Sequence, residues 1–255
     1  MHLVGWATRD MLTISGKHER STMGVGIAHE VVFFRHRLLG RVYACFKEPQ
    51  LWVDLVKFFE KACSLQFEDT DKQKIYETIS FKEVHREATQ LKELTGLLNA
   101  PVVFAHNDLL SQNLMLNDEQ EKPYIIDFEY GSYNYRGFDI GNYFNEYAGY
   151  DCDYSLYPSK DEQCQIFSHY LQPEKPYEIR VSENDLEALY VEANTFMLAS
   201  HIFWPLWAII QARMSPIDFD YIEYFFSRYN EYKKQKEIPL QNLTEEHKIL
   251  SVSHE

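Results

Sequence analysis

Two short segments of the sequence carry acidic and amide side chains at a spacing suited to moving a phosphoryl group. Residues 106–113 read HNDLLSQN, and residues 126–130 read IDFEY. Phosphoryl transfer needs a base near the attacking hydroxyl and oxygen ligands that hold Mg²⁺ on the phosphates. Asp108 suits the role of base, and Asn113 and Asp127 suit the role of metal ligands. A neutral amide also ligates the cation without adding negative charge beside Asp127.

Short apolar runs around these segments predict the elements that position them. Residues 102–105 (VVFA) directly precede the first segment and read as a buried strand from which the polar loop starts. Residues 114–116 and 124–126 are apolar and are separated by a polar turn, which predicts an antiparallel hairpin. Such a hairpin returns Asp127 to the side of Asn113.

A loop-closing role is the alternative for each of these polar residues. Asp and Asn are common in turns because their side chains bond neighbouring backbone groups. Each residue taken alone fits that role as well as a catalytic one, whereas the two segments together favour the catalytic interpretation. His106 is expected to hold the loop by a hydrogen bond rather than to carry protons.

Four segments spread over much of the chain are similar to motifs of one enzyme family. Residues 49–236 resemble the C-terminal lobe of the ethanolamine and choline kinases, whose fold is similar to that of protein kinases and aminoglycoside phosphotransferases. The resemblance implies a mainly helical α+β lobe, like that of a protein kinase, with a short β-hairpin at the active site. The segments are 101–110 (PVVFAHNDLL), 126–130 (IDFEY), 135–149 (YRGFDIGNYFNEYAG) and 199–207 (ASHIFWPLW).

The resemblance also implies a reaction and a role for each acidic residue. Asp108 would be the base, Asn113 and Asp127 the metal ligands, and Glu129 a supporting acid at the metal. ATP as co-substrate and Mg²⁺ would serve an ethanolamine kinase, whose product phosphoethanolamine enters phosphatidylethanolamine synthesis. Choline stays open as the alternative substrate. Two segments look more like ethanolamine kinases than choline kinases, namely 144–149 (FNEYAG) and 215–220 (SPIDFD).

Aromatic residues and one carboxylate are the candidates for binding a small ammonium substrate. A cation is attracted to aromatic faces and to a carboxylate at short range. Trp204 and Trp207 lie three residues apart in an expected helix, so they project from one face. The resemblance adds Tyr224 and Glu146 to this pocket. Core packing is the alternative, because an aromatic stripe at helical spacing usually lies in the interior.

Length, composition and charge indicate one large domain that does not bind nucleic acid. The chain has 255 residues, of which 45% are hydrophobic and 15% aromatic, so it can bury a full core. Its formal net charge of -14 argues against a nucleic-acid surface, which needs clustered Lys and Arg. The same charge is compatible with a cationic substrate, which a negative cleft attracts.

Several features indicate a cytoplasmic protein without a transmembrane segment. The four cysteines are scattered with no CxxC pair, so we expect reduced thiols. The N-terminus lacks the pattern of a secretory signal. The most apolar window, residues 195–210, is shorter than a bilayer span and contains His201 and Pro205, so a buried helix is expected there.

Hydrophobic periodicity and capping residues predict the helices around the acidic segments. Ser80 and Ser182 precede two of these helices and are good N-caps. Pro205 falls inside the longest helix, where it removes an amide donor; it predicts a kink that would shift Trp204 against Trp207. The expected helices are 51–61, 80 to about 101, 137–147, 161–171, one from 182 through Pro205, and 218–236.

Residues 1–48 resemble the family least. Full-length relatives carry a nucleotide-binding lobe with a phosphate-covering loop and a strand lysine, and neither element is visible in this segment; residues 27–39 alone suggest a helix. The tail 237–255 is polar and is expected to be disordered. Gln112 and Tyr143 replace a Gly and a His that are usual in the family.

Three functions are compatible with these observations. The leading one is an ethanolamine kinase. The second is a catalytically impaired, amine-binding or partner-binding fragment of such a kinase, because the nucleotide lobe is not visible. A helical scaffold ranks last, because it leaves the acidic motif unexplained. The oligomeric state stays open, with a homodimer among the options.

Overall fold

The computed structural model describes residues 48–117, 122–171 and 181–237 of the chain. The segment 1–47, with the helix expected at 27–39, and the tail from residue 238 lie outside the described residues. Helices dominate the described part and the strands are short, which confirms the mainly helical α+β fold expected from the sequence.

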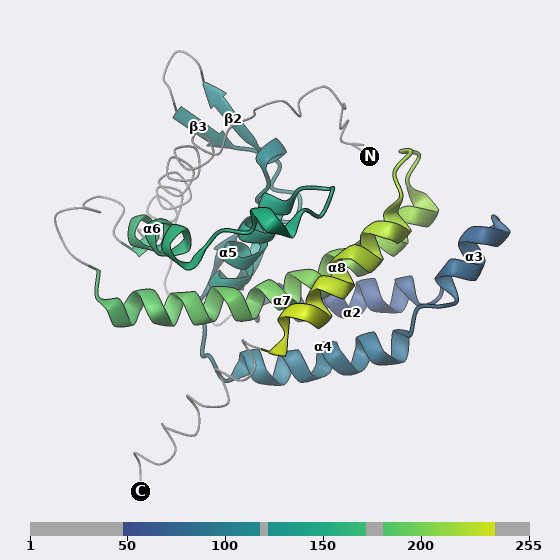
Figure 1. The fold of residues 1–255 in the computed structure, drawn as a ribbon, viewed down its shortest axis with the longest axis horizontal. Helices are drawn as coiled ribbons and strands as arrows, with labels where there is room; N and C mark the ends of the chain where they lie inside the picture. The colour runs from purple at the N-terminus through teal and green to yellow at the C-terminus, as the bar shows by residue number, and fades with distance from the viewer. Residues whose placement is uncertain (1–47, 118–121, 172–180, 238–255) are drawn as a thin grey trace, which may run out of the picture.

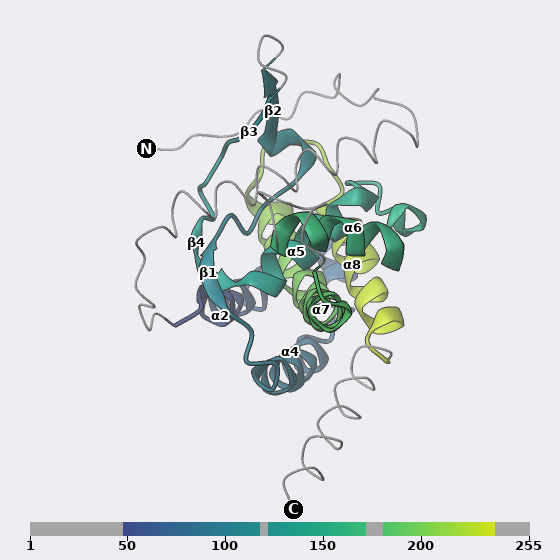
Figure 2. The same ribbon diagram turned by 90° about the vertical axis from the view of Figure 1, so that its left-hand side faces the viewer.

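A long helix, α7 (Glu183–Met214), is the centre of the fold. Figure 2 shows α7 nearly end-on, with α2, α4, α5 and α8 arranged around it. Figure 1 shows the same helices from the side, with α3 (Thr70–Tyr76) near one end of α8. The helices that pack on α7 are α2 (Gln50–Ala62), α4 (Phe81–Gly96), α5 (Arg136–Asn145), α6 (Lys160–Leu171) and α8 (Tyr221–Gln235).

In the described part of the chain, the strands form two separate antiparallel pairs. β1 (Val102–Ala105) pairs with β4 (Ser132–Tyr135), and β2 (Leu114–Asn117) pairs with β3 (Lys122–Ile125), which confirms the expected hairpin. The prediction that residues 102–105 form a buried strand is wrong in its burial, because Val102 and Phe104 are each 36% exposed. A sheet of two strands leaves much of its surface uncovered, and within residues 102–105 only Ala105 is buried.

Helix starts agree with the sequence better than helix ends do. Ser80 and Ser182 cap α4 and α7, each accepting a hydrogen bond from the backbone N–H three residues further on. α4 ends at Gly96, earlier than expected, and α8 begins at Tyr221, later than expected, because Asp220 caps it. These shifts do not change which elements flank the acidic segments.

α7 is a core helix of the described domain. By length and composition it could cross a membrane, but 89% of its most apolar window is buried inside the fold. This burial confirms the expectation for residues 195–210. The helix continues without interruption through Pro205. Trp204 and Trp207 keep an edge-to-face contact, with their ring centroids 5.6 Å apart.

α5 and α7 approach each other very closely at Gly141. A Cβ atom at this position would lie 2.5 Å from the carbonyl oxygen of Ala193 and 2.7 Å from the backbone nitrogen of Met197, so a side chain has no room. At the start of α5, Arg136 forms a largely buried ion pair with Glu192 of α7. The close approach at Gly141 fixes the position of α5, and two polar residues of this helix, Asp139 and Asn142, contact the first acidic segment.

Candidate active site

A carboxylate from α5 holds the acidic loop, residues 106–113, in place. Asp139 accepts hydrogen bonds from the backbone N–H groups of His106, at 3.1 Å, and Asn107, at 2.7 Å. His106 Nε2 lies 2.8 Å from the carbonyl oxygen of Ile126, so the ring ties the loop to the second acidic segment. The holding role expected of His106 is therefore confirmed.

Replacing Asp139 with asparagine is expected to loosen the acidic loop. An amide presents one oxygen and one NH₂ group to two backbone donors, so one N–H group is left without an acceptor in a buried place. We expect chemical denaturation to show a loss of about 2 kcal/mol in the free energy of unfolding. Equal unfolding free energies for Asp139→Asn and the unaltered chain would contradict this anchoring role.

Asp108 lies within the acidic loop and is bonded to Asn113. Asn113 Nδ2 donates to the Asp108 carbonyl oxygen at 2.8 Å and to its carboxylate Oδ2 at 3.3 Å. Burial, together with the nearby carboxylate of Glu146, raises the pKa of Asp108 to about 7, although the Asn113 hydrogen bond lowers it. An aspartate with a pKa near neutrality is suited to accept a proton at physiological pH.

The hairpin brings the second acidic segment back to the loop. The backbone N–H of Ile126 donates to the carbonyl oxygen of Asn113 at 2.9 Å. Asp127 is the next residue after Ile126, so this hydrogen bond brings it close to the acidic loop. Asp127 has a left-handed backbone, with φ +61°, and an exposed side chain. Repulsion from Asp127 and Glu129 contributes to the raised pKa of Asp108. The structure therefore brings the predicted base and the predicted metal ligands into one region.

Oxygen ligands for Mg²⁺ are present there, but they do not form a preassembled metal cluster. Nowhere in the described residues do three His, Cys, Asp or Glu side chains gather closely enough to hold a metal ion. Because Asn113 Nδ2 is bonded to Asp108, Oδ1 is the amide atom that remains to ligate a cation. Mg²⁺ takes one or two carboxylates together with phosphate and water, and it would relieve the repulsion between Asp108, Asp127 and Glu129. This donor set fits the ion.

Trp204 and Trp207 are joined to the second acidic segment through Tyr130. Trp207 Nε1 donates to the Tyr130 hydroxyl at 3.0 Å, and the Trp204 ring meets the Tyr130 ring edge-on at a centroid distance of 5.3 Å. Trp204 is buried and Trp207 is partly exposed. The aromatic pair therefore serves as core packing on one side and adjoins the acidic segment on the other.

Arg228 of α8 brings Glu146 and Tyr224 together. Its Nη1 donates to Glu146 Oε1 at 3.1 Å and to the Tyr224 hydroxyl at 3.0 Å. Glu146 begins the short 3₁₀-helix η3 that follows α5. It is close enough to Asp108 to raise the pKa of that residue. The second half of the predicted amine pocket thus lies beside the predicted base.

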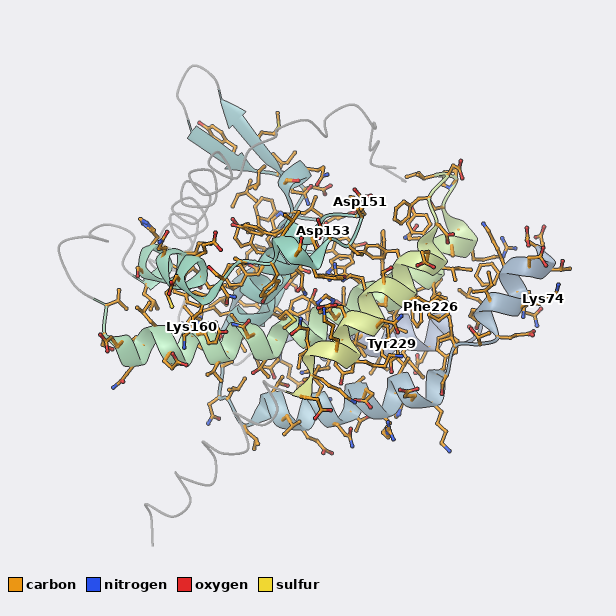
Figure 3. All side chains as sticks on the ribbon, viewed as in Figure 1. Lys74, Asp151, Asp153, Lys160, Phe226 and Tyr229 are labelled. Carbon is orange, nitrogen blue, oxygen red and sulfur yellow. The ribbon has the colours of Figure 1, made fainter. Side chains whose placement is uncertain are left out.

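Tyr150 is a residue of this region that the sequence did not single out. It follows η3, and its neighbour Asp151 is labelled in Figure 3. Its ring packs on Tyr224 at a centroid distance of 6.2 Å. Tyr150 is partly exposed, but desolvation by its neighbours and the carboxylates of Glu146 and Asp108 raise the pKa of Tyr150, so its hydroxyl stays protonated at neutral pH. A single aromatic residue in a loop has no periodicity, which is why the sequence pattern did not reveal it.

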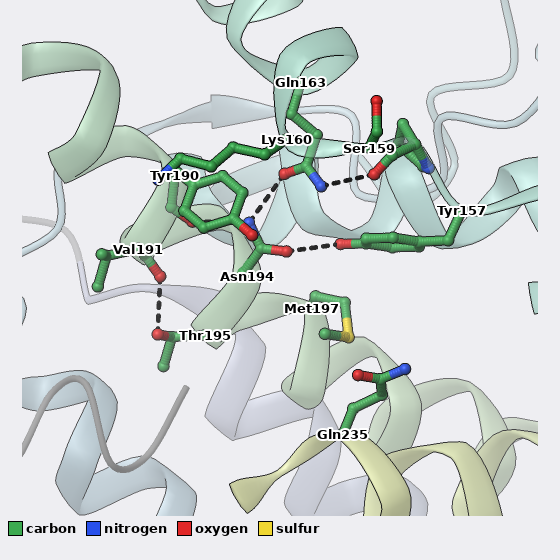
Figure 4. Close-up of a pocket in the computed structure, with 11 residues that line it drawn as sticks. Tyr157, Ser159, Lys160, Gln163, Tyr190, Val191, Asn194, Thr195, Met197 and Gln235 are labelled. Atoms are coloured by element: carbon green, nitrogen blue, oxygen red, sulfur yellow. Dashed lines mark hydrogen bonds between the residues drawn. The ribbon is translucent and has the colours of Figure 1, made fainter. Parts of the chain in front are cut away.

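A cavity of about 300 Å³ lies apart from these residues, between α6, α7 and the end of α8 (Figure 4). Polar side chains that line the cavity bond one another: Asn194 Nδ2 donates to Gln163 Oε1 at 2.8 Å, and the Tyr157 hydroxyl donates to Asn194 Oδ1 at 3.0 Å. None of the candidate catalytic or amine-binding residues lines it. The cavity therefore lies outside the candidate active site.

Together, the helical body, the hairpin and the acidic loop define a protein-kinase-like fold. Solved structures with this fold include an ethanolamine kinase from Plasmodium vivax, with a TM-score of 0.69 and 29% identity, matching 83% of this chain and 59% of that one. A choline kinase from Cryptosporidium parvum has a TM-score of 0.62 and 25% identity, and the match covers 88% of this chain and 67% of the choline kinase chain.

Sequence comparison identifies the family. A model of the choline/ethanolamine kinase family matches residues 20–233, and the chain belongs to this family. A probable ethanolamine kinase of Arabidopsis thaliana is 68% identical over 198 residues, which are 78% of this chain and 52% of that protein. Ethanolamine kinase 1 of Homo sapiens is 42% identical over 194 residues, which are 74% of this chain and 43% of the human protein. The chain spans about half the length of these relatives.

Proposed function

We propose that this chain carries the phosphoryl-transfer site of an ethanolamine kinase, which makes phosphoethanolamine for phosphatidylethanolamine synthesis in the cytoplasm. The main support is Asp108, a mostly buried carboxylate with a raised pKa that is bonded to Asn113. Ethanolamine is favoured over choline because the relative at 68% identity is named a probable ethanolamine kinase.

In this proposal Asp108 accepts the proton of the ethanolamine hydroxyl as that oxygen bonds to the γ-phosphorus of ATP and the bond to ADP breaks. Asn113 orients the Asp108 carboxylate toward the hydroxyl. Asn113 and Asp127 would hold Mg²⁺, with Glu129 in support. The bound ion would neutralise charge on the phosphates.

The ammonium end of the substrate would lie against the second group of residues. Glu146 supplies a negative charge, and the rings of Trp204, Trp207 and Tyr224 supply faces that attract a cation. Because Glu146 is also close to Asp108, an amine held there leaves the hydroxyl of a two-carbon alcohol near the base.

A binding fragment without activity is the second candidate. It is favoured by one observation, that the chain spans about half the length of its relatives. Nucleotide positioning supplies much of the catalysis in phosphoryl transfer, so a chain that does not position ATP would bind an amine without turning it over.

Assays of the purified chain with ATP and Mg²⁺ distinguish the two candidates. We expect phosphorylation of ethanolamine at least about tenfold faster than that of choline, measured as kcat/KM. Because only ionised Asp108 accepts a proton, kcat/KM should rise as the pH rises through about 7 and then level off. A profile that is flat between about pH 5 and pH 9 would contradict the role of Asp108 as base.

If no phosphorylation is observed, calorimetry can measure whether the chain binds ethanolamine. Ethanolamine binding without phosphorylation would support the binding fragment and exclude the enzyme for this chain. Absence of both binding and phosphorylation, in protein that melts cooperatively, would exclude both candidates.

A further inference from the structure

Arg228 is the hub of a buried hydrogen-bond network that has no part in the proposed proton transfer. Its side chain is 1% exposed. Through Nη1 the guanidinium donates to Glu146 and Tyr224, and through Nη2 it donates to the Ser200 hydroxyl of α7 at 2.7 Å. One planar group on α8 therefore contacts two further elements, the 3₁₀-helix η3 after α5 and helix α7.

The network continues from Ser200 to the acidic loop. The Ser200 hydroxyl donates to Asn142 Oδ1 at 2.8 Å, and the Trp204 indole N–H donates to the same oxygen at 2.7 Å. Asn142 Nδ2 in turn donates to the carbonyl oxygen of Asn107 at 3.3 Å. Asn107 directly precedes Asp108, so an unbroken series of hydrogen bonds joins Arg228 to the neighbour of the base.

We propose that Arg228 is a positioning residue: it fixes the positions of the proposed amine-binding residues Glu146, Tyr224 and Trp204 relative to the acidic loop. Its guanidinium orients Glu146 and Tyr224 directly, and it holds Trp204 through Ser200 and Asn142. This inference rests on the proposed function for its substrate, an amino alcohol, while its geometry rests on the network alone.

The guanidinium shape is essential to this role. Arginine presents several N–H donors in a rigid plane, so it bonds Glu146 and Tyr224 with one nitrogen and Ser200 with the other. A lysine keeps the positive charge but has one nitrogen on a flexible stem, and it cannot span both sides. Arg228→Lys therefore separates the effect of position from the effect of charge.

Steady-state kinetics of Arg228→Lys measure the effect on the substrate. We expect KM for ethanolamine to rise about 10- to 100-fold, as befits the loss of hydrogen bonds to a charged group, while KM for ATP stays unchanged. A loss of folded protein alone would lower the apparent kcat and leave both KM values as they are. Arg136→Lys is the matched control, since Arg136 also forms a buried pair with a glutamate; it should lower the melting temperature without moving KM.

The indole N–H resonance of Trp204 reports on the network without any substrate. Arg228→Lys should shift this resonance in ¹H–¹⁵N spectra, and Arg136→Lys should leave it in place. Ser200→Ala cuts the link to Asn142 but keeps the contacts with Glu146 and Tyr224. Ser200→Ala should shift the Trp204 resonance with a smaller effect on KM for ethanolamine. If Arg228→Lys does not fold, the resonance in Ser200→Ala tests whether the network positions Trp204.

The outcomes separate this inference from the proposed function. An unchanged KM for ethanolamine in Arg228→Lys would overturn the positioning role even if the enzyme is confirmed. If the unaltered chain neither binds nor phosphorylates ethanolamine, the proposed function fails and the indole resonance decides. A shift in Arg228→Lys or Ser200→Ala that is absent from Arg136→Lys then supports the network role, and its absence from both overturns it.

Discussion

Replacing Asp108 with asparagine is expected to slow the proposed phosphoryl transfer strongly and, at the same time, to stabilise the fold. The loss of a general base lowers the rate by about 10²- to 10⁴-fold. The gain in stability follows from burial, which raises the pKa of Asp108 to about 7 and so disfavours its charged form in the folded state. An asparagine keeps an oxygen that accepts from Asn113 and carries no charge.

The sign of this stability effect depends on pH. Because the folded pKa lies above the value of about 3.9 in an unfolded chain, the contribution of Asp108 is fully favourable below about pH 4 and is lost as the pH rises through about 7. At pH above 7 the ionised carboxylate therefore opposes folding, by roughly 4 kcal/mol at most. The asparagine variant removes this penalty, so its advantage should grow with pH.

Thermal melts at about pH 5.5 and about pH 8.5 check the prediction. The melting temperature of Asp108→Asn should exceed that of the unaltered chain, with a clearly larger difference at the higher pH. Asp151→Asn is a suitable control, because Asp151 is exposed in a neighbouring loop and should give no such pH-dependent gain. An Asp108→Asn variant that melts at a lower temperature than the unaltered chain at the higher pH would show that the ionised Asp108 carboxylate does not destabilise the fold.

Local sequence patterns predicted the longer helices, β1 and the β2–β3 hairpin, because each of these patterns is local in the sequence; α3 and β4 were not predicted. Periodic apolar residues located α2, and Ser80 and Ser182 marked the starts of α4 and α7. Burial was less predictable. The apolar run at 102–105 fits a buried strand, but its exposure depends on how many strands pair beside it, and among the described residues only β4 does so.

The candidate site was predictable to the extent that its residues are close in sequence. Asp108 and Asn113 are five residues apart, and one amide bonds both the carbonyl and the carboxylate of Asp108. The partner of Glu146 could not be foreseen in this way, because Arg228 lies 82 residues further along the chain. Two helices have to pack on α7 before this ion pair exists, and no local pattern records that packing.

The packing of α5 on α7 depends on the absence of a side chain at Gly141, which leads to the second large expected effect. In Gly141→Ala the new methyl group would meet backbone atoms of α7, at Ala193 and Met197, and backbone cannot move aside as a flexible side chain can. Alanine favours a helix over glycine by about 1 kcal/mol, but overpacking against a rigid helix outweighs this gain. We expect a net loss of about 3 kcal/mol, or a fall in melting temperature of about 6–12 °C.

Gly96→Ala is the matched control for this substitution, since Gly96 lies at the end of α4 and a Cβ there meets nothing within 4 Å. It should leave the chain as stable as before or raise its stability by up to about 1 kcal/mol. Gly141→Ala should also move Asn142 away from Ser200 and Trp204, because α5 must separate from α7 to admit the methyl group. The indole resonance of Trp204 should then shift even in fully folded protein. Equal melting temperatures for Gly141→Ala and Gly96→Ala would mean that the two helices are not held at the observed distance.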